Sequence, residues 1–170
     1  MRNVLLTGLP GSGKSTAGKY LAQLLDRDFL DLDEEIVRRT GKTIPELFEP
    51  GEEHFRKAET AVLEALLEEG ITDTVIACGG GVVVTPENKD LLRKLGTVVY
   101  LRRSPGAICR SGDLEGRPLL AEGKEKIYDL YWQRMKLYET TANWTVDNEG
   151  TLKEVLVRLV RLCRREEETR

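Results

Sequence analysis

The stretch Gly8-Leu9-Pro10-Gly11-Ser12-Gly13-Lys14-Ser15 determines the fold of this 170-residue chain. It matches the phosphate-binding pattern G-x-x-x-x-G-K-[ST] at every position, and a chance match in a chain of this length occurs about once in a hundred. The glycines allow a turn in which consecutive backbone N–H groups point at phosphate oxygens. A helix that begins in the turn adds the positive end of its dipole, so the stretch predicts a nucleotide-binding loop.

The side chains of this loop suit ATP with Mg²⁺. Lys14 supplies a positive charge for the β- and γ-phosphates and is expected to be catalytic. The Ser15 hydroxyl is a hard oxygen ligand for Mg²⁺. The predicted cofactors are therefore ATP and Mg²⁺. The loop residues expected to bind the nucleotide are Gly11, Ser12, Gly13, Lys14, Ser15 and Thr16.

The segments on either side of the loop have the character that a nucleotide-binding loop requires. Asn3–Thr7 is an apolar run of strand length, and Lys14–Leu25 has the pattern of a helix. Further along, short apolar runs alternate with helical patterns, which predicts a parallel sheet covered on both faces, with ligands at the carboxyl ends of its strands. The further predicted strands are residues 29–32, 74–77, 97–101 and 144–146.

The remaining predicted helices fill the intervals between these strands. The region 44–67 reads as one broken helix or two, interrupted near Pro50-Gly51. Thr85-Pro86-Glu87 is expected to open a helix, with Thr85 as the cap. The charged tail, residues 164–170, is expected to fray. The other predicted helices are residues 34–39, 105–110, 124–140 and 152–163.

Length and composition argue against several classes of protein. A chain of 170 residues is long enough for one sizeable core and short for two, so residues 1–170 are expected to form one domain. The net charge of -3, without a long basic run, predicts no nucleic-acid partner. No apolar stretch reaches the roughly 18 to 20 residues that span a bilayer, so no membrane association is expected. No exposed apolar stripe is evident, and a monomer is expected.

The cysteines indicate a reducing compartment. Cys78, Cys109 and Cys163 are an odd number without C-x-x-C spacing, which argues against a disulfide framework and against a cysteine-rich zinc site. A cytoplasmic location is therefore expected. Cys78 lies in an apolar run, and we interpret it as a packed small residue and not as a nucleophile.

Two carboxylates follow the second predicted strand. Asp31 and Asp33 lie two residues apart, and such residues share a face of an extended chain, so both can point into one cleft. A kinase that acts on a hydroxyl group needs one carboxylate to orient the hydroxyl and accept its proton, and another near Mg²⁺. The alternative is that one of the two only caps the helix that begins near Glu34.

A charged helical pair and a glycine triplet are further candidates for the acceptor site. In Phe55-Arg56-x-x-Glu59 the charged residues lie three apart on a helix and can pair; the alternative is a solvated surface pair. Gly79-Gly80-Gly81 follows the third predicted strand and would let a ligand lie directly on the backbone; the alternative is a tight turn.

Three arginines complete the candidate set. Arg110 and Arg117 bracket a glycine-containing segment, residues 111–123, which reads as a lid that closes with Arg117 over the phosphates. Arg134 lies one helical turn before Tyr138. Taken singly, an arginine is more often an ordinary surface residue than a functional one.

Together these motifs resemble those of the shikimate kinase family, from about Asn3 to Leu162. The phosphate-binding loop alone is shared by a vast superfamily, whereas the ordered combination at these spacings is specific. The matching motifs are the loop itself, Asp31-x-Asp33, Gly51-Glu52-x-x-Phe55-Arg56-x-x-Glu59, Gly79-Gly80-Gly81, Arg117-Pro118-Leu119-Leu120 and Arg134-x-x-x-Tyr138.

The resemblance implies transfer of the ATP γ-phosphoryl group to the 3-hydroxyl of shikimate, within aromatic amino-acid biosynthesis. It also implies the P-loop kinase fold, an α/β three-layer sandwich whose five-stranded parallel sheet has the order 2-3-1-4-5. About residues 33–60 would then form the substrate-binding helical region, and about residues 111–123 the lid.

The resemblance further implies roles for the acceptor-side residues. The residue matching Asp33 holds ring hydroxyls and is the candidate base, and those matching Arg56 and Arg134 bind the shikimate carboxylate. Within the triplet Gly79, Gly80 and Gly81, the middle glycine contacts the substrate through its backbone. A planar carboxylate is well held by guanidinium forks, so these implied roles are chemically reasonable.

On the nucleotide side, the resemblance places Asp31 near Mg²⁺, through water. Arg110 and Arg117 would serve adenine and phosphates, and Arg117 would be catalytic. The segment Asp147-Asn148-Glu149-Gly150 lies where the family's adenine loop sits, but it matches no firm motif.

Three other functions remain open on the residues alone. Gluconate is also a polyhydroxy carboxylate, so a gluconate kinase fits the same aspartate and arginine pattern. A nucleoside monophosphate kinase fits less well, because its lid would carry more arginines. A nucleotide-binding regulatory module without catalysis would be expected to have lost one of Lys14, Ser15, Asp33 or Arg117, and all four are present.

Overall fold

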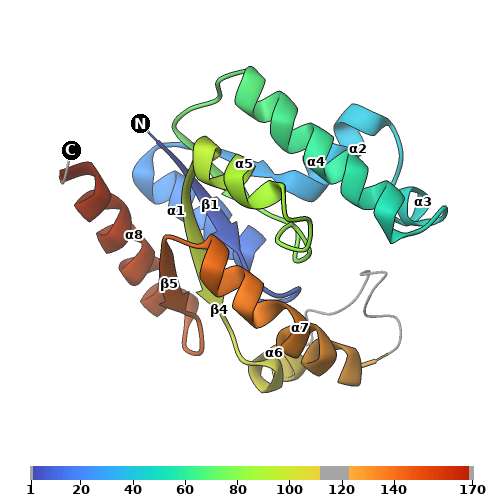
Figure 1. Ribbon diagram of the computed structural model, residues 1–170. Coiled ribbons are helices and arrows are strands. Elements are labelled where there is room, and N and C mark those ends of the chain that lie inside the picture. Colours follow the sequence, from blue (N-terminus) through green and yellow to red (C-terminus); the bar gives the residue numbers. More distant parts are fainter. Residues whose placement is uncertain (1, 112–122, 169–170) are drawn as a thin grey trace.

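The computed structural model describes residues 2–111 and 123–168, which form a five-stranded parallel sheet with helices on both faces (Figure 1). The strand order is β2-β3-β1-β4-β5, so the predicted α/β fold and the implied strand order are confirmed. The strands are β1 Asn3–Thr7, β2 Asp28–Asp31, β3 Thr74–Ala77, β4 Gly96–Arg102 and β5 Trp144–Asp147. The helices are α1 Lys14–Leu25, α2 Leu32–Thr40, α3 Ile44–Phe48, α4 Glu52–Glu68, α5 Asn88–Leu95, α6 Pro105–Ser111, α7 Glu125–Thr141 and α8 Leu152–Glu168.

The side chains of the central strands alternate between two cores. In β1, Val4 and Leu6 pack with α1 and α8, whereas Leu5 packs on the opposite face with α2, α4, α5 and α7. Burial on both faces explains why β1, β3 and most of β4 read as continuous apolar runs. Since the strands are parallel, their carboxyl ends share one edge, and the segments after all five strands meet there.

Two element boundaries differ from the sequence-based predictions near β2 and α4. Strand β2 ends at Asp31 and not at residue 32, because one Asp31 oxygen accepts hydrogen bonds from the backbone N–H groups of Asp33 and Glu34, 3.0 and 3.3 Å away, and caps α2. The region 44–67 is two helices, α3 and α4, and Gly51 between them has φ +130°, a backbone conformation that favours glycine.

The predicted start of α5 at Thr85-Pro86-Glu87 is wrong. Residues 80–87 form successive turns and a bend, and the helix begins only at Asn88. The Asn88 side chain is buried: its amide donates to the Val82 carbonyl at 2.9 Å, and its oxygen accepts from the Thr60 hydroxyl at 2.8 Å. These tertiary contacts, and not a local cap, determine where the helix starts.

The prediction that the tail frays is also wrong for residues 164–168. Helix α8 continues through Glu168, because side chains near its end contact Trp144, the first residue of β5, and Arg27, just before β2. Trp144 donates its indole N–H to Glu166 at 2.9 Å, and Glu167 forms an ion pair with the buried guanidinium of Arg27.

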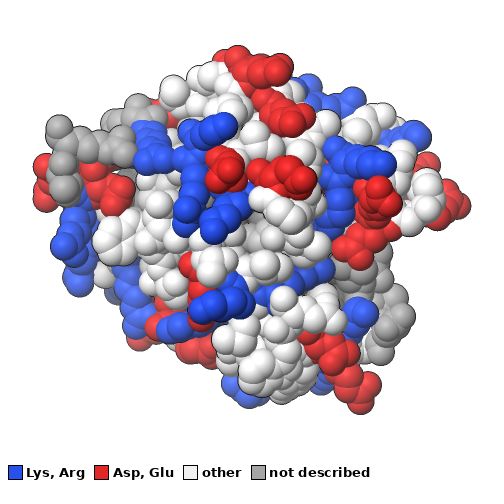
Figure 2. Space-filling model, in the orientation of Figure 1, with Lys and Arg blue, Asp and Glu red and all other residues white. Residues whose placement is uncertain are grey.

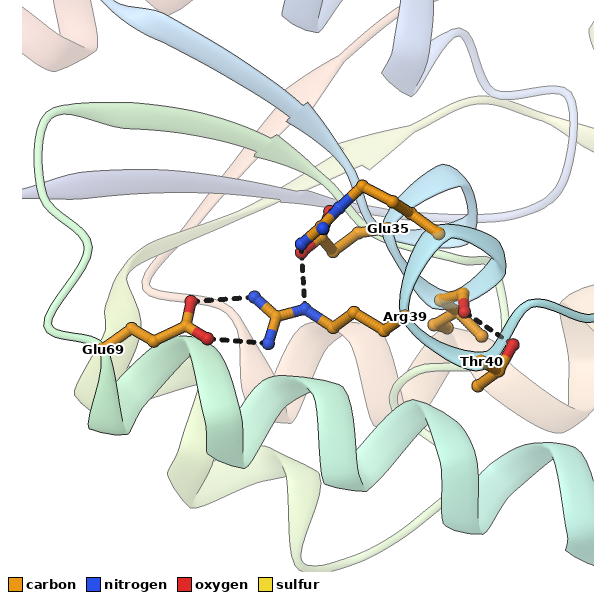
Figure 3. Close-up of polar contacts among 6 residues, drawn as sticks. Glu35, Arg39, Thr40 and Glu69 are labelled. Carbon is orange, nitrogen blue, oxygen red and sulfur yellow. Dashed lines mark hydrogen bonds and ion pairs between the residues drawn. The ribbon is translucent and has the colours of Figure 1, made fainter.

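An ion-pair network joins α2 to the end of α4, the two longer helices of the expected substrate-binding region. Arg39 binds both carboxylate oxygens of Glu69, at 2.7 and 2.8 Å, and its Nε binds Glu35 (Figure 3). The bidentate geometry fixes the relative position of the two helices. Acidic and basic side chains are interspersed over the face shown in Figure 2, as such pairs require.

No helix in the described part of the chain is both long and apolar enough to cross a membrane. The expected lid, residues 111–123, lies almost entirely outside the described residues, and Arg117 with it.

Candidate active site

The predicted phosphate-binding loop lies between β1 and α1 and is closely surrounded by the protein. Gly8 has φ +147°, and a Cβ there would lie 2.5 Å from the Leu101 carbonyl oxygen, so only glycine fits. The ammonium group of Lys14 lies inside the loop, 2.8 Å from the carbonyl oxygens of both Gly8 and Leu9. Lys14 is only 6% exposed, and its charge therefore faces the concave side of the loop.

Two contacts from distant segments hold the loop. The side-chain amide of Asn148, after β5, donates to the Ser12 carbonyl at 2.8 Å. Arg103, after β4, donates to the Gly11 carbonyl at 3.3 Å. Sequence reasoning assigned no role to either residue. The only signal in the sequence was that residues 147–150 follow the fifth strand, where the resemblance places the adenine loop. That position indicated proximity to the nucleotide but no contact with the phosphate-binding loop.

Asp31 both caps a helix and faces the phosphate-binding loop. One oxygen caps α2, and the other accepts a hydrogen bond from the Ser15 hydroxyl at 2.6 Å. A hydroxyl and a carboxylate oxygen are the ligand types that Mg²⁺ uses together with phosphates and water. Two protein oxygens leave most of the coordination sphere of Mg²⁺ to phosphates and water, so they suit an ion that arrives with a nucleotide.

The glycine triplet lies in a run of turns, in which Gly79 and Gly81 accept backbone hydrogen bonds from Val82 and Val84, and it also lies against three other candidate elements. A Cβ on Gly79 would lie 2.9 Å from an Asp33 oxygen, and one on Gly80 would lie 2.7 Å from Pro10 of the phosphate-binding loop. A Cβ on Gly81 would lie 2.0 Å from the Arg56 guanidinium. Glycines are needed here because charged side chains pack directly on the backbone, which brings the predicted acceptor residues next to the predicted nucleotide loop.

Arg56 is not a solvated surface residue. It is 8% exposed and forms ion pairs at 2.9 Å with Glu59 and with Glu52. Glu59 is fully buried, and its second oxygen has no hydrogen-bond partner within the described ranges. Burial raises the pKa of Glu59 to about 7, an effect that the neighbouring Arg56 only partly offsets. The sequence named Glu59 as a motif position but gave no sign that it is buried.

Arg134, on α7, is also buried, at 4% exposure. Its Nη1 atom has no hydrogen-bond partner among the residues that the structure describes, and a buried unsatisfied guanidinium N–H is a strong donor for a bound anion. Arg134 lines a cavity of about 220 Å³ between α4 and α7, together with Glu52 and Lys126. Two other cavities lie elsewhere, between the N-terminal strand and α8 and between α1 and α8.

The positions of the remaining predicted residues neither support nor oppose a role in ligand binding. Arg110 is exposed at the end of α6, and Thr16 is exposed in the first turn of α1. Cys78 is buried at 3% exposure, and burial raises the pKa of its thiol strongly, so it is a packed residue as predicted. None of the three cysteines is in a disulfide.

The chain is similar to shikimate kinases in sequence and structure. The model of the shikimate kinase family matches residues 10–164. The shikimate kinase of Clostridium beijerinckii is 39% identical over 157 residues, covering 92% of each chain, and that of Neisseria gonorrhoeae is 41% identical over 165 residues, covering 95% of this chain and 96% of the relative. A solved structure described as shikimate kinase from Acinetobacter baumannii in complex with shikimate has a TM-score of 0.88 and 36% identity, covering 98% of this chain and 94% of that one.

One relative is much longer. The bifunctional shikimate kinase/3-dehydroquinate synthase of Thermotoga maritima is 45% identical over 136 residues, which cover 79% of this chain but only 27% of the relative. The chain thus spans about a quarter of that protein, and the similarity carries no argument about the synthase activity.

Proposed function

This chain belongs to the shikimate kinase family and is an ATP-dependent kinase; from that premise we propose that its own residues transfer the γ-phosphoryl group of ATP to the 3-hydroxyl of shikimate. The observation that carries the proposal is the convergence of buried Arg56 and of Asp33 on a glycine triplet that touches the phosphate-binding loop. Buried Arg134 lies close enough to interact electrostatically with Glu59, the ion-pair partner of Arg56. A small polyhydroxy carboxylate needs two such arginines for its carboxylate and an aspartate for its hydroxyls.

On the nucleotide side, the backbone of residues 11–16 and the Lys14 ammonium would bind the phosphates. The Ser15 hydroxyl and Asp31 would hold Mg²⁺, Ser15 directly and Asp31 through water, and the ion would neutralise charge on the phosphates. Lys14 would exchange its loop carbonyl partners for phosphate oxygens, which develop more negative charge in the transition state. The expected roles of Arg110 and Arg117 stay predictions.

On the acceptor side, Asp33 would orient the 3-hydroxyl and accept its proton as the phosphoryl group transfers. Arg56 and Arg134 would bind the carboxylate at the other end of the ring. Glu59 would hold Arg56 in place, because their 2.9 Å ion pair fixes the guanidinium above Gly81. Since both arginines are buried, they lose little freedom when the substrate binds.

The division of labour between these residues can be tested by steady-state kinetics. Arg56→Lys and Arg134→Lys should raise the KM for shikimate by about tenfold or more with a smaller change in kcat, because a lysine cannot make the bidentate contact that exists in both ground and transition states. Asp33→Asn should mainly lower kcat, by about a hundredfold or more, since proton acceptance matters most in the transition state. Arg38→Lys, an exposed arginine on α2, is the matched control and should change neither constant.

If Asp33→Asn leaves kcat intact and only weakens binding, Asp33 orients the substrate and is not the base. If neither arginine variant changes the KM for shikimate while both remain folded, the carboxylate lies elsewhere.

A further inference from the structure

Tyr138 connects two of the proposed acceptor-binding groups. It lies on α7 and is fully buried, and its hydroxyl donates a hydrogen bond to the Gly80 carbonyl oxygen at 2.5 Å, across 58 residues of sequence. The motif Arg134-x-x-x-Tyr138 was noted in the sequence, but the mechanism above gives its tyrosine no role.

The bond to Gly80 fixes more than one oxygen. A peptide unit is planar and trans, so its carbonyl oxygen and the N–H of the next residue point in opposite directions. Holding the Gly80 carbonyl therefore fixes the plane of the Gly80–Gly81 peptide and the direction of the Gly81 N–H. Glycines have more backbone freedom than other residues, so three in succession need an external contact to keep one orientation.

The same hydroxyl also lies beside Arg134. The two residues are four apart on α7 and share a face of the helix, and the guanidinium interacts with the tyrosine hydroxyl. On the other side of the peptide, Gly81 lies against the Arg56 guanidinium. The Gly80–Gly81 peptide is thus between the two arginines proposed to hold the substrate carboxylate.

The tyrosine ring is itself held rigidly. It stacks on Tyr100 of β4, with ring centroids 5.0 Å apart and an interplanar angle of 20°. Burial raises the pKa of Tyr138 well above its usual range, so the hydroxyl keeps its proton and remains a donor at neutral pH.

We propose that Tyr138 is a positioning residue for the acceptor. Its hydroxyl fixes the orientation of the Gly80–Gly81 peptide relative to the Arg134 guanidinium, so that the peptide and the guanidinium can bind the same substrate molecule. The inference rests on the proposed function, because it assumes that Gly80 and Arg134 bind the acceptor. In this proposal Tyr138 acts on the acceptor only through Gly80 and Arg134.

The test compares two phenylalanine substitutions in the same aromatic stack. Tyr138→Phe removes only the hydroxyl and keeps the ring. Tyr100→Phe is the matched control, because the Tyr100 hydroxyl is buried and has no hydrogen-bond partner in the described part of the chain. For wild type and both variants, KM for shikimate, KM for ATP, kcat and the melting temperature are measured.

Tyr138→Phe should raise the KM for shikimate about tenfold, the size of effect expected from losing one well-placed buried hydrogen bond. Its kcat should fall by less than about twofold, since the bond serves ground and transition states alike, and its KM for ATP should not change. Tyr100→Phe should leave all three constants at their wild-type values. A purely structural role for the Tyr138 hydroxyl would lower the melting temperature without this selective rise in KM, and that result would overturn the proposal.

A second measurement uses the wild-type protein, in case Tyr138→Phe does not fold. The hydroxyl proton of Tyr138, labelled selectively and observed by NMR, should exchange slowly and should shift on addition of shikimate but not on addition of ADP alone. A signal that shikimate leaves unmoved would count against the proposal. If wild-type protein turns over MgATP but not shikimate, the proposed function fails; if it turns over shikimate and Tyr138→Phe has the wild-type KM, only the role of Tyr138 fails.

Discussion

Glu59 lies in an environment that is unusual for a glutamate. It is a fully buried carboxylate, in contact with Arg56 and near Asp33, and burial raises its pKa to about 7 from an ordinary value of 4.5. Because the folded-state pKa is raised, the protonated form stabilises the fold. This contribution is fully present below pH 4.5 and is lost as the pH rises through about 7.

The raised pKa of Glu59 predicts that shikimate binding takes up a proton. A substrate carboxylate at Arg56 would add negative charge near Glu59 and raise its pKa further, so binding should weaken as the pH rises through about 7. Titration calorimetry at pH 7 in two buffers of different ionisation enthalpy measures the proton uptake directly. The same titration with Glu59→Gln, which cannot ionise, should show much less uptake. Proton release by the wild type, or uptake that Glu59→Gln does not reduce, would contradict this account of Glu59.

Residues were predictable from sequence where the chemistry is local. The phosphate-binding loop is one continuous stretch, so the positions of Lys14 and Ser15 followed from the motif itself. The burial of Glu59 and the contact of Tyr138 with Gly80 depend on residues far along the chain, and no spacing encodes them.

At the scale of elements, the turn between β5 and α8 supports the phosphate-binding loop. Asn148 bonds the Ser12 carbonyl, and the neighbouring Glu149 accepts hydrogen bonds from the backbone N–H and hydroxyl of Ser104, just before α6. This turn thus links the nucleotide loop to the helix that carries Arg110.

We predict that Asn148→Ala raises the KM for ATP about three- to tenfold and leaves the KM for shikimate within about twofold, since one partly buried hydrogen bond to the loop is lost. Lys153→Ala, at an exposed position on α8, is the control. Steady-state kinetics with each substrate varied in turn measures both constants. An equal rise in both KM values would mean that Asn148 supports the whole site and not the nucleotide loop in particular.

The bounds of helices and strands were predicted well where the residues of the element itself determine them. They were predicted poorly where contacts with other elements determine them. The buried strands β1, β3 and β4 were located within one residue, because only strands covered on both faces give such short apolar runs. The start of α5 and the length of α8 were wrong because Asn88 and Glu166 are held by side chains 28 and 22 residues away.

At the scale of the whole molecule, the sheet joins two cores, and helices α2, α3 and α4, which are expected to bind the substrate, belong to one of them. Leu63 of α4 and Leu21 of α1 are both fully buried, on opposite faces of the sheet. If the chain is one domain, as expected from its length, the two faces unfold together.

Leu63→Ala and Leu21→Ala should each reduce the free energy of unfolding by about 2–5 kcal/mol. The control Leu24→Ala, at a position 58% exposed on α1, should cost less than about 1 kcal/mol. Urea unfolding followed by fluorescence and by far-UV circular dichroism should give one coincident transition for all variants. Two separate transitions in Leu63→Ala would mean that helices α2, α3 and α4 unfold separately from the rest of the protein.

The most direct test of the central claim is identification of the phosphorylated product. Wild-type protein is incubated with MgATP and, separately, shikimate, gluconate, AMP or buffer, and ³¹P NMR follows the reaction. The account predicts a new phosphomonoester signal only with shikimate, coupled to the ring proton at C3, with an equal amount of ADP, and no signal above background from Lys14→Met. A phosphomonoester formed from gluconate but not from shikimate, consumption of AMP to give two ADP without any product from shikimate, or ADP formed from ATP in the shikimate sample without any new phosphomonoester, would contradict it.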